Sequence, residues 1–448
     1  MLKELLRPEI EDIIKQRRWK DLRIGLEGWE PAEIAELLLE IEKEYKVLLF
    51  RALPREVSTQ VFSHIDSEER DQLLNELTDG ETRRLLADMS PDDRTALLEE
   101  LPAKVTKSLM NMLSAEDLKE ARYLLGYPEE SIGRLMTPDF VTVQPDYTIR
   151  QAIEHIRKFG KDSETIYRVY VIDDNGRLID DILLKNLILA EEEMKISELM
   201  DDTYLSLSAF DDREEAVRML EKYDVLALPV VDSNGYIVGI VTFDDIYDVS
   251  EEETTEDFQR TSGINPLDQS YLSASIWKLY GKRVPWLLAM VFANFITASV
   301  ISHYDYVTVA FVSLVAFIPL LTGTGGNSGT QSATLIIRGI ATDDIRYNDW
   351  LRVFRKEMVV GLLLGVSLAI VAFIRGYLES DHALQLAWVI STSLIILILW
   401  SNVIGSLLPI LLHKMKLDPA VISGPVITTI VDVSGLLIYF NIAIYMMD

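Results

Sequence analysis

The strongest constraint on this chain is the way its charged and apolar residues are separated along the sequence. Most of the charged side chains come before about residue 260, whereas the remainder of the 448 residues is largely apolar. An apolar stretch of about 18 or more residues with few charges is long enough to cross a bilayer as a helix. The chain is therefore predicted to have an acidic half in water and a second half in a membrane.

Five apolar segments are the predicted membrane spans. They run from about residues 284 to 302, 306 to 321, 358 to 374, 384 to 412 and 420 to 447, and the second continues into a glycine-rich stretch. Ten Lys and Arg residues flank one side of these segments, and only Arg375 lies on the other. Basic flanks stay in the cytoplasm. We therefore expect a multi-pass protein of the cell or inner membrane, with the N-terminus cytoplasmic and the C-terminus outside.

The charge balance excludes several classes of function. There are 71 acidic and 43 basic residues, which give a net charge of -28. Nucleic acid is not an expected partner, because its phosphates need Lys and Arg, whereas a cation is. The absence of cysteine excludes disulfides and thiolate metal sites. The sequence has no nucleophile–base pair, no phosphate-binding P-loop and no histidine pair at ligand spacing, so an enzyme is not expected.

A repeat of 12 residues predicts a train of short helices in residues 1–130. Apolar residues recur at this interval, and each is followed by a capping or turn residue: Leu53, Ile65, Leu77, Met89, Leu101 and Leu113. Asp66 with Glu69, and Thr78 with Glu81, have the spacing of a capping box, and Pro91 suits a first helical position. We expect helices of about two turns, stacked as a superhelix that serves as a scaffold or docking surface.

A longer repeat predicts two copies of a strand–helix–hairpin unit. VIDDNGRLIDDI at 171–182 matches VVDSNGYIVGIV at 230–241, and Asn-Gly between β-branched runs is a strong hairpin signal. The two copies, 131–190 and 191–248, resemble a tandem of CBS domains. This resemblance implies a regulatory unit that binds an adenine nucleotide, such as ATP, or another small effector. Gly239, Thr242 and Asp245 match the family's ribose-phosphate motif, which the first copy lacks. A pair that binds no nucleotide remains an alternative.

The linker at 245–270 is strongly acidic at its start. From Asp244 to Asp257 there are eight carboxylates and no Lys or Arg. On a helix, Asp245, Asp248 and Glu252 share one face, where like charges repel unless a cation neutralises them. A solvated surface is the ordinary interpretation of such a run. Its place between a regulatory pair and the first span favours a sensor for a hard divalent cation, which prefers oxygen ligands.

Two polar features lie at membrane depth. The first is PLLTGTGGNSGTQS at 319–332, whose small residues allow either close helix packing or a broken helix with exposed carbonyls. The second includes Asp432, about two turns inside the last span and close to Thr428 and Thr429. An ionised side chain is costly there. Because no Lys or Arg lies well inside a predicted span, a cation from solution is favoured over a basic partner in the protein.

At this point the chain resembles the MgtE family of magnesium channels over essentially its whole length. The order of the domains and the motifs GTGGNSGTQSAT and DP…SxP…DxxG carry the resemblance. It implies a mixed fold, with an α-helical superhelical N domain, an α/β CBS pair and a five-helix transmembrane pore domain at 271–448. It also implies a homodimer in the lipid bilayer, with an ion site of Asp432, Thr428 and Thr429 from each copy that holds Mg²⁺. The implied pore-lining residues are Gly325, Gly326, Asn327 and Asp418.

The resemblance further implies feedback by cytoplasmic Mg²⁺. Ions bound among carboxylates of the N domain, the CBS pair and the linking "plug" helix would favour the closed dimer. The residues that match the family's sensor positions are Asp92, Asp224, Asp245, Asp248, Glu253, Glu256 and Asp257. Ala96 stands where the family has a further acid, so part of the sensor is expected to differ. A secondary transporter of divalent cations coupled to H⁺ or Na⁺ remains an alternative, because an intramembrane Asp can carry protons.

Overall fold

The computed structural model forms two compact units, Met1–Glu253 and Thr254–Asp448. The structure describes residues 2–65, 67–267, 271–272, 274–342, 344–378, 383–415, 417–419 and 424–447. The helical N domain, the CBS pair and the apolar C-terminal helices that the sequence predicts are all present. Of the predicted helix caps, Asp66 lies outside the described residues.

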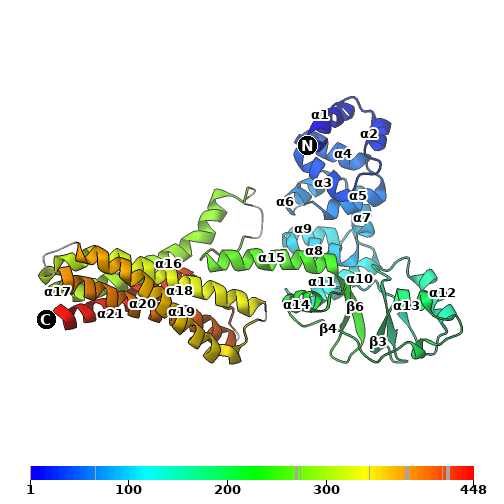
Figure 1. Cartoon of the computed structure of the whole chain (residues 1–448). Helices are drawn as coiled ribbons and strands as arrows, with labels where there is room; N and C mark the ends of the chain where they lie inside the picture. The colour runs from blue at the N-terminus through cyan, green and yellow to red at the C-terminus, as the bar shows by residue number, and fades with distance from the viewer. Residues whose placement is uncertain are drawn as a thin grey trace. The chain divides into compact units, whose positions relative to one another are not determined.

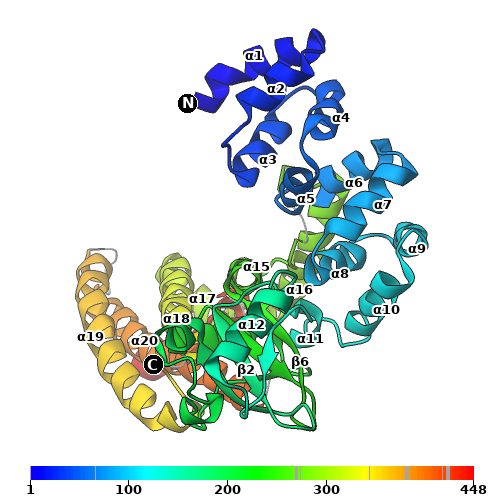
Figure 2. The ribbon, with the colours of Figure 1, turned by 90° about the vertical axis from the view of Figure 1, so that its right-hand side faces the viewer.

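The first part of unit 1 is a train of short helices that follow one another in a curved stack (Figure 2). They are α1 (Leu2–Lys15), α2 (Trp19–Gly25), α3 (Pro31–Glu40), α4 (Lys43–Ala52), α5 (Arg55–Ser63), α6 (Ser67–Glu76), α7 (Asp79–Asp88), α8 (Pro91–Glu100), α9 (Ala103–Met110) and α10 (Ala115–Leu124). The repeat of 12 residues sets their spacing, because Leu53, Met89 and Leu101 directly follow α4, α7 and α8 and are buried. The capping box of Thr78 and Glu81 is formed.

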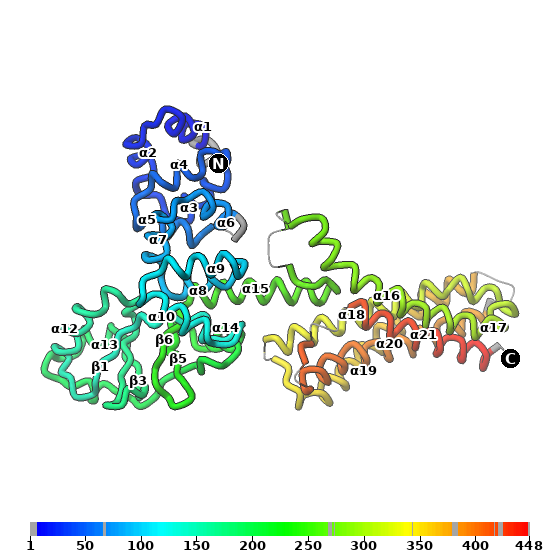
Figure 3. Tube along the Cα trace, turned by 180° about the vertical axis from the view of Figure 1, so that it is seen from behind, coloured from blue at the N-terminus to red at the C-terminus, as the bar shows by residue number. Residues whose placement is uncertain are grey.

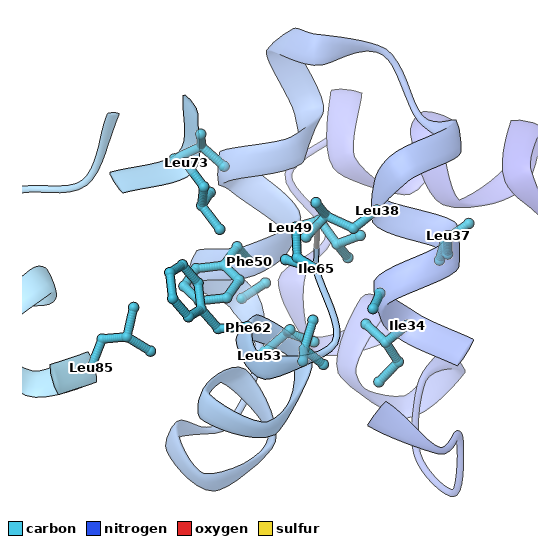
Figure 4. Close-up of a cluster of buried hydrophobic side chains, with 14 of the residues drawn as sticks. Ile34, Leu37, Leu38, Leu49, Phe50, Leu53, Phe62, Ile65, Leu73 and Leu85 are labelled. Carbon is cyan, nitrogen blue, oxygen red and sulfur yellow. The ribbon is translucent and has the colours of Figure 1, made fainter. Parts of the chain in front are cut away.

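A continuous apolar core holds this train together (Figure 4). Phe50 of α4 and Phe62 of α5 meet edge to face, with their ring centres 6.2 Å apart. Leu49 of α4 packs in the same core, and Leu73 extends it to α6. Burying such a side chain contributes about 1.5–3 kcal/mol, whereas a helix of two to three turns is not stable alone in water. The stacking therefore stabilises these helices.

The second part of unit 1 contains two small sheets of the same topology. In sheet 1, β1 (Thr142–Val143) pairs parallel with β2 (Arg168–Ile172), which pairs antiparallel with β3 (Leu178–Leu183). In sheet 2, β4 (Leu207–Ser208), β5 (Ala227–Val231) and β6 (Ile237–Thr242) repeat this order. The helices are α11 (Ile132–Leu135), α12 (Ile149–Phe159), α13 (Leu184–Leu189), the 3₁₀ turn η1 (Ile196–Glu198) and α14 (Arg213–Tyr223). In Figure 3, α12 and α13 lie beside sheet 1 and α14 beside sheet 2.

The hairpins of the two copies have the predicted Asn-Gly turns and touch each other. Gly176 and Gly235 have φ of 88° and 84°, a conformation that favours glycine. The Leu178 amide donates a hydrogen bond of 3.1 Å to the carbonyl of Gly235, so the turn of one copy pairs with the strand of the other. After β6 the chain enters α15 (Phe243–Thr261), the acidic helix.

Unit 2 is a bundle of long apolar helices. Its elements are α16 (Ile276–His303), α17 (Asp305–Ala310), the 3₁₀ segment η2 (Val312–Phe317), α18 (Ile318–Ala341), the 3₁₀ turn η3 (Tyr347–Asp349), α19 (Trp350–Tyr377), α20 (Ala383–Lys414) and α21 (Gly424–Met447). The helix α20 packs against α18, α19 and α21, and these four run side by side (Figure 1). In the described residues, four helices are long and apolar enough to cross a membrane, namely α16, α19 with η3, α20 and α21.

The structure differs from the sequence prediction at the second span. A regular span was expected over residues 306–321, but the chain there forms α17, a break at Phe311 with φ -132° and ψ 74°, and then η2. The long helix begins only at Ile318, with Pro319 in its first turn, and carries the glycine-rich stretch to Ala341. Because this stretch is polar, α18 does not have the apolar content of the other four helices.

The glycine-rich stretch is continuous helix, and its small residues allow close packing. A Cβ at Gly326 would lie 2.7 Å from Cγ2 of Thr428 on α21. A Cβ at Gly405 of α20 would overlap the backbone of Gly329, and the Ser401 hydroxyl donates to the carbonyl of Gly325. Close approach of two backbones is how membrane helices gain packing energy without a hydrophobic effect. Of the two alternatives for this stretch, helix packing is the one observed.

We predict that Gly405→Ala destabilises unit 2, because the new methyl group meets the backbone of Gly329 and the two helices must separate. Overpacking of this kind costs about 1–3 kcal/mol. Thermal unfolding of the purified protein in detergent should show a lower midpoint. Gly323→Ala on α18 is the matched control, because nothing lies within 4 Å of its Cβ position. Equal midpoints for the two variants would contradict the packing argument.

Candidate functional site

The first candidate site is the polar group in the first turns of α21. Thr428 and Thr429 follow the start of this helix by four and five residues, and Asp432 comes one turn later. The Thr428 hydroxyl donates a 2.9 Å hydrogen bond to the carbonyl of Gly424, and Thr429 donates one of the same length to Pro425. Since each hydroxyl hydrogen is used within the helix, the two oxygens present lone pairs to their surroundings.

Asp432 is half-buried and incompletely satisfied. Its Oδ1 atom is buried and makes no hydrogen bond, and none of the ion pairs among the described residues includes Asp432. An ionised oxygen without a partner is costly in apolar surroundings. The arrangement therefore offers a carboxylate oxygen and two hydroxyl oxygens to a group that donates hydrogen bonds or carries positive charge.

The four residues expected to line a pore fall into three environments. Gly325 and Gly326 are buried where α18 meets α20 and α21, so within one chain they serve helix packing. Asn327 is exposed on α18. Asp418 lies between α20 and α21 in the sequence, and its carboxylate accepts a 2.6 Å hydrogen bond from Arg260.

The second candidate site is a cluster of acids in unit 1. Asp92, in the first turn of α8, is 8% exposed, and its Oδ1 atom makes no hydrogen bond. Burial raises the pKa of Asp92 to about 6, with a smaller contribution from Asp93. Burial, and then the charge of Asp92, raises the pKa of Asp245 well above its usual value. Burial and the neighbouring charge of Asp244 also raise the pKa of Asp248. Three of the seven predicted sensor residues therefore share one acidic neighbourhood.

Glu164 belongs to the same neighbourhood and was not predicted. It lies between α12 and β2, and burial raises its pKa to about 7, followed by the charges of Asp92 and Asp244. No short sequence signal marks it, because it is a single acid in a loop far along the chain from the other acids. Within the described residues, no three His, Asp or Glu side chains already stand in a metal-binding geometry. The acids around Asp92 are therefore near one another without being arranged as the ligands of a metal ion.

Two other predicted sensor residues of unit 1 have different surroundings. Glu253 pairs with Arg213 of α14, whose Nη2 lies 2.8 Å from Oε1, and the same guanidinium lies 3.0 Å from Glu252. Asp224 is exposed and ends α14 in a left-handed conformation with φ 52°. Neither Glu253 nor Asp224 is among the main charges that shift the pKa of Asp92 or Asp245.

The last two predicted sensor residues, Glu256 and Asp257, lie in unit 2, and a basic residue pairs with the first of them. Arg260 of α15 forms ion pairs with Glu256 and with Asp418. Burial, and then the charge of Asp418, raises the pKa of Asp257. Neither Arg213 nor Arg260 was predicted to belong to the sensor. Both lie outside the acidic run, so only the fold shows that they neutralise part of it.

The residues of the nucleotide motif already bond to one another. The Thr242 hydroxyl donates a 2.7 Å hydrogen bond to Oδ2 of Asp245. At Gly239 of β6, a Cβ would lie 2.9 Å from the Met136 side chain and from the carbonyl of Thr137. This glycine is therefore required by the packing of Met136 and Thr137, directly after α11, on β6, whether or not a ligand binds.

Three family models match the chain. The MgtE intracellular N domain matches residues 29–130, the CBS domain matches 132–193 and 196–252, and a divalent cation transporter model named MgtE matches 318–442. Together they cover both candidate sites.

Individual proteins match as well. The chain is 37% identical over 445 residues to the magnesium transporter MgtE of Thermus thermophilus, covering 99% of this chain and 98% of the relative. Identity to the magnesium transporter MgtE of Bacillus subtilis is 35% over 334 residues, or 75% of this chain and 73% of the relative.

Two solved structures resemble unit 1. A crystal structure of the cytosolic domain of the Mg²⁺ channel MgtE in complex with ATP matches with a TM-score of 0.52 and 31% identity, covering 55% of this chain and all of that one. The soluble part of a magnesium transporter matches with the same TM-score and 27% identity, over 56% of this chain and 99% of that one.

We predict that without divalent cations unit 1 loses stability as the pH rises. The folded state keeps Asp92 and Glu164 protonated up to about pH 6 and 7, whereas in the unfolded chain they ionise near the ordinary pKa values of 3.8 and 4.5. Stability is thus fully present below those ordinary values and is lost as the pH rises through the raised ones. Thermal unfolding of the full chain in a chelator, from pH 4 upward, measures the loss.

The matched variant is Asp92→Asn, which cannot ionise. Its unfolding midpoint should fall less between about pH 4 and 6 than that of the natural chain, because the contribution of Asp92 is removed. Saturating Mg²⁺ at neutral pH should restore stability to the natural chain. A midpoint that rises with pH in the chelator would contradict the prediction.

Proposed function

The chain belongs to the MgtE family of magnesium transporters, and on this premise we propose that it is an Mg²⁺ channel of the cell membrane closed by cytoplasmic Mg²⁺. The observation that carries the proposal is the buried, unbonded Oδ1 atom of Asp432 on an apolar helix. Several apolar helices make the chain a multi-pass membrane protein. Five spans, with a cytoplasmic N-terminus and an external C-terminus, are part of the proposal, and the one-sided distribution of Lys and Arg supports them.

The proposed pore site consists of Asp432 from two copies of the chain. Mg²⁺ gives up its water reluctantly and is usually held through several water ligands. Water on the ion donates hydrogen bonds, which suits an unbonded carboxylate oxygen and the free lone pairs of Thr428 and Thr429. Two aspartates, one from each copy of a homodimer, would balance the two positive charges. The half-buried state of Asp432 in a single chain is consistent with a face that a second copy completes.

The acidic helix α15 suggests where Mg²⁺ would act as a regulator. The carboxylates of its later part have arginine partners, since Arg213 meets Glu252 and Glu253, and Arg260 meets Glu256. The acids of its first part have no arginine among their main electrostatic neighbours. Burial raises the pKa of Asp245 and Asp248, and the charges of Asp92 and Asp244 raise it further, against a hydrogen bond from Thr242 to Asp245 and the nearby His64 at Asp248.

A bound cation would therefore stabilise the first part of α15 more than its later part. We place the regulatory Mg²⁺ there, with Asp92 and Glu164 contributing. Of the predicted sensor set, Asp224 would contribute only through a second copy or another state. Ions that bind the closed form better shift the population toward it.

ATP is the proposed small-molecule ligand of the CBS pair. The support is the similarity of unit 1 to a cytosolic domain solved with ATP, together with the motif residues Gly239, Thr242 and Asp245. Because Asp245 is bonded to Thr242 and also belongs to the acidic cluster, nucleotide and Mg²⁺ binding would be linked through one carboxylate.

We predict that Asp432→Asn lowers the Mg²⁺ current of the reconstituted channel by at least about tenfold, because a site of charged ligands sets the affinity of a pore for its ion. The matched control is Asp305→Asn, an exposed acid at the start of α17. Single-channel recording in planar bilayers measures both variants. An unchanged current in Asp432→Asn would refute the assigned ion site.

The same recordings separate the channel from the coupled transporter. With a fixed Mg²⁺ gradient, a pH or Na⁺ gradient should leave the Mg²⁺ current unchanged. The flux through a channel is driven only by the electrochemical gradient of the permeating ion. A flux that reverses with the pH or Na⁺ gradient would favour the transporter.

We predict that Asp245→Asn weakens closure by cytoplasmic Mg²⁺. Removing one of the mutually repelling charges reduces the benefit of binding the ion, so the concentration for half closure should rise about fivefold or more, within the usual range of coupling energies. The unitary current should not change. Asp174→Asn in the exposed β2–β3 turn is the control. A half-closing concentration equal to that of the natural chain would place the sensor elsewhere.

A further inference from the structure

A second carboxylate with partners on neighbouring helices is Glu357 of α19, one residue before the apolar segment predicted from about residue 358. Its Oε2 atom accepts a 2.9 Å hydrogen bond from the hydroxyl of Ser332 on α18. The same atom accepts a 3.1 Å hydrogen bond from Nδ2 of Asn402 on α20. One oxygen thus joins three helices. None of the ion pairs among the described residues includes Glu357, so its known partners are neutral donors.

The network continues on the other side of Asn402. Its Oδ1 atom accepts a 2.6 Å hydrogen bond from the hydroxyl of Ser328, one turn before Ser332 on α18. Asn402 is 2% exposed, and both serines are buried. The amide therefore has a fixed orientation, with its oxygen toward Ser328 and its nitrogen toward Glu357. A buried amide hydrogen without an acceptor is unfavourable. Glu357 supplies the acceptor for the side-chain amide of Asn402.

These bonds favour one rotation of α18 about its own axis. Ser328 and Ser332 are four residues apart and share the face that meets α20. Asn327 and Gln331 each precede one of them by one residue, which is about 100° around the helix, and both are exposed. The remaining contacts of α18 combine closely packed glycines with the buried side chains of Leu321, Ala333 and Ile336, and the serine bonds add direction to this packing. The polar bonds hold the amides on their face.

We propose that Glu357 is a positioning residue for the ion pathway. Through Ser332 and Asn402 it fixes the rotation of α18, so that Asn327 and Gln331 present their amides to the permeating ion. This inference rests on the proposed channel function and adds a residue that acts from outside the ion site. What is required of Glu357 is the acceptor oxygen, because both of its partners donate.

Glutamine separates this role from a direct one. The side-chain amide oxygen of Gln can accept the same two hydrogen bonds and carries no charge. A carboxylate that binds the ion or carries a proton would lose its function in Glu357→Gln. A carboxylate that only positions α18 would keep it.

The test is single-channel recording of the full chain in planar bilayers, with Mg²⁺ as the permeating ion. Glu357→Gln should retain the natural unitary current and its pH dependence. Glu357→Ala and the milder Ser332→Ala should lower the unitary current, by up to about tenfold, since a buried donor or acceptor is left without its partner. The Mg²⁺ concentration for half closure should not change. Ser367→Ala is the matched control, because Ser367 is an exposed residue of α19 that bonds only to the carbonyl of Leu363.

A double variant measures the coupling. Since Glu357 and Asn402 act as one unit, Glu357→Ala with Asn402→Ala should lower the current no more than the more damaging single change. If Glu357→Ala does not fold, Glu357→Gln and Ser332→Ala still decide the question. A current in Glu357→Gln as low as in Glu357→Ala, or a natural current in both alanine variants, would overturn the positioning role. A natural chain without Mg²⁺ current would instead overturn the proposed function.

Discussion

The structure of the membrane half depends on the cost of an ionised carboxylate in apolar surroundings. Every polar group there needs a partner, and the partners differ between Asp432 and Glu357. Glu357 has two neutral donors from neighbouring helices, so its charge is held inside the protein. Asp432 has a buried oxygen without any hydrogen bond. Because of that difference, Glu357 is proposed as part of the scaffold and Asp432 as the ion site.

The same principle applies to the acidic helix α15 in water, with smaller energies because water screens exposed charges. Arginines from outside the run neutralise its later carboxylates, and the earlier ones face other acids. The positions of the arginines therefore divide the helix into a part whose carboxylates are partly neutralised and a part with excess negative charge. A divalent cation would gain most at the second, which is why the proposed regulatory site lies there.

Close helix packing and polar bonding are combined in α18. Its glycines bring the backbones of α18, α20 and α21 close together, yet they give the contact little rotational preference. The serine hydroxyls and the Asn402 amide supply directional bonds that glycines lack. The glycine-rich stretch of α18 was compatible with a broken helix from its sequence. It is a continuous helix in the structure, because neighbouring helices pack against its small residues.

The sequence by itself determined the features that depend on neighbours along the chain. The repeat of 12 residues predicted the train of short helices, the Asn-Gly turns predicted the two hairpins, and the long apolar segments predicted α16, α19, α20 and α21. The position of Asp432 in the last span was also evident. Each of these follows from local periodicity, turn chemistry or hydropathy, which are properties of short segments.

Only the tertiary structure decided which side chains meet. Arg213 neutralises Glu253, Glu164 joins the acids around Asp92, and Glu357 bonds to Ser332 and Asn402. The break at Phe311 and the late start of α18 were also not predicted. Charges and hydrogen bonds act over a few ångströms in space, and residues far apart in sequence come that close only when helices pack. No pattern in a single segment contains that information.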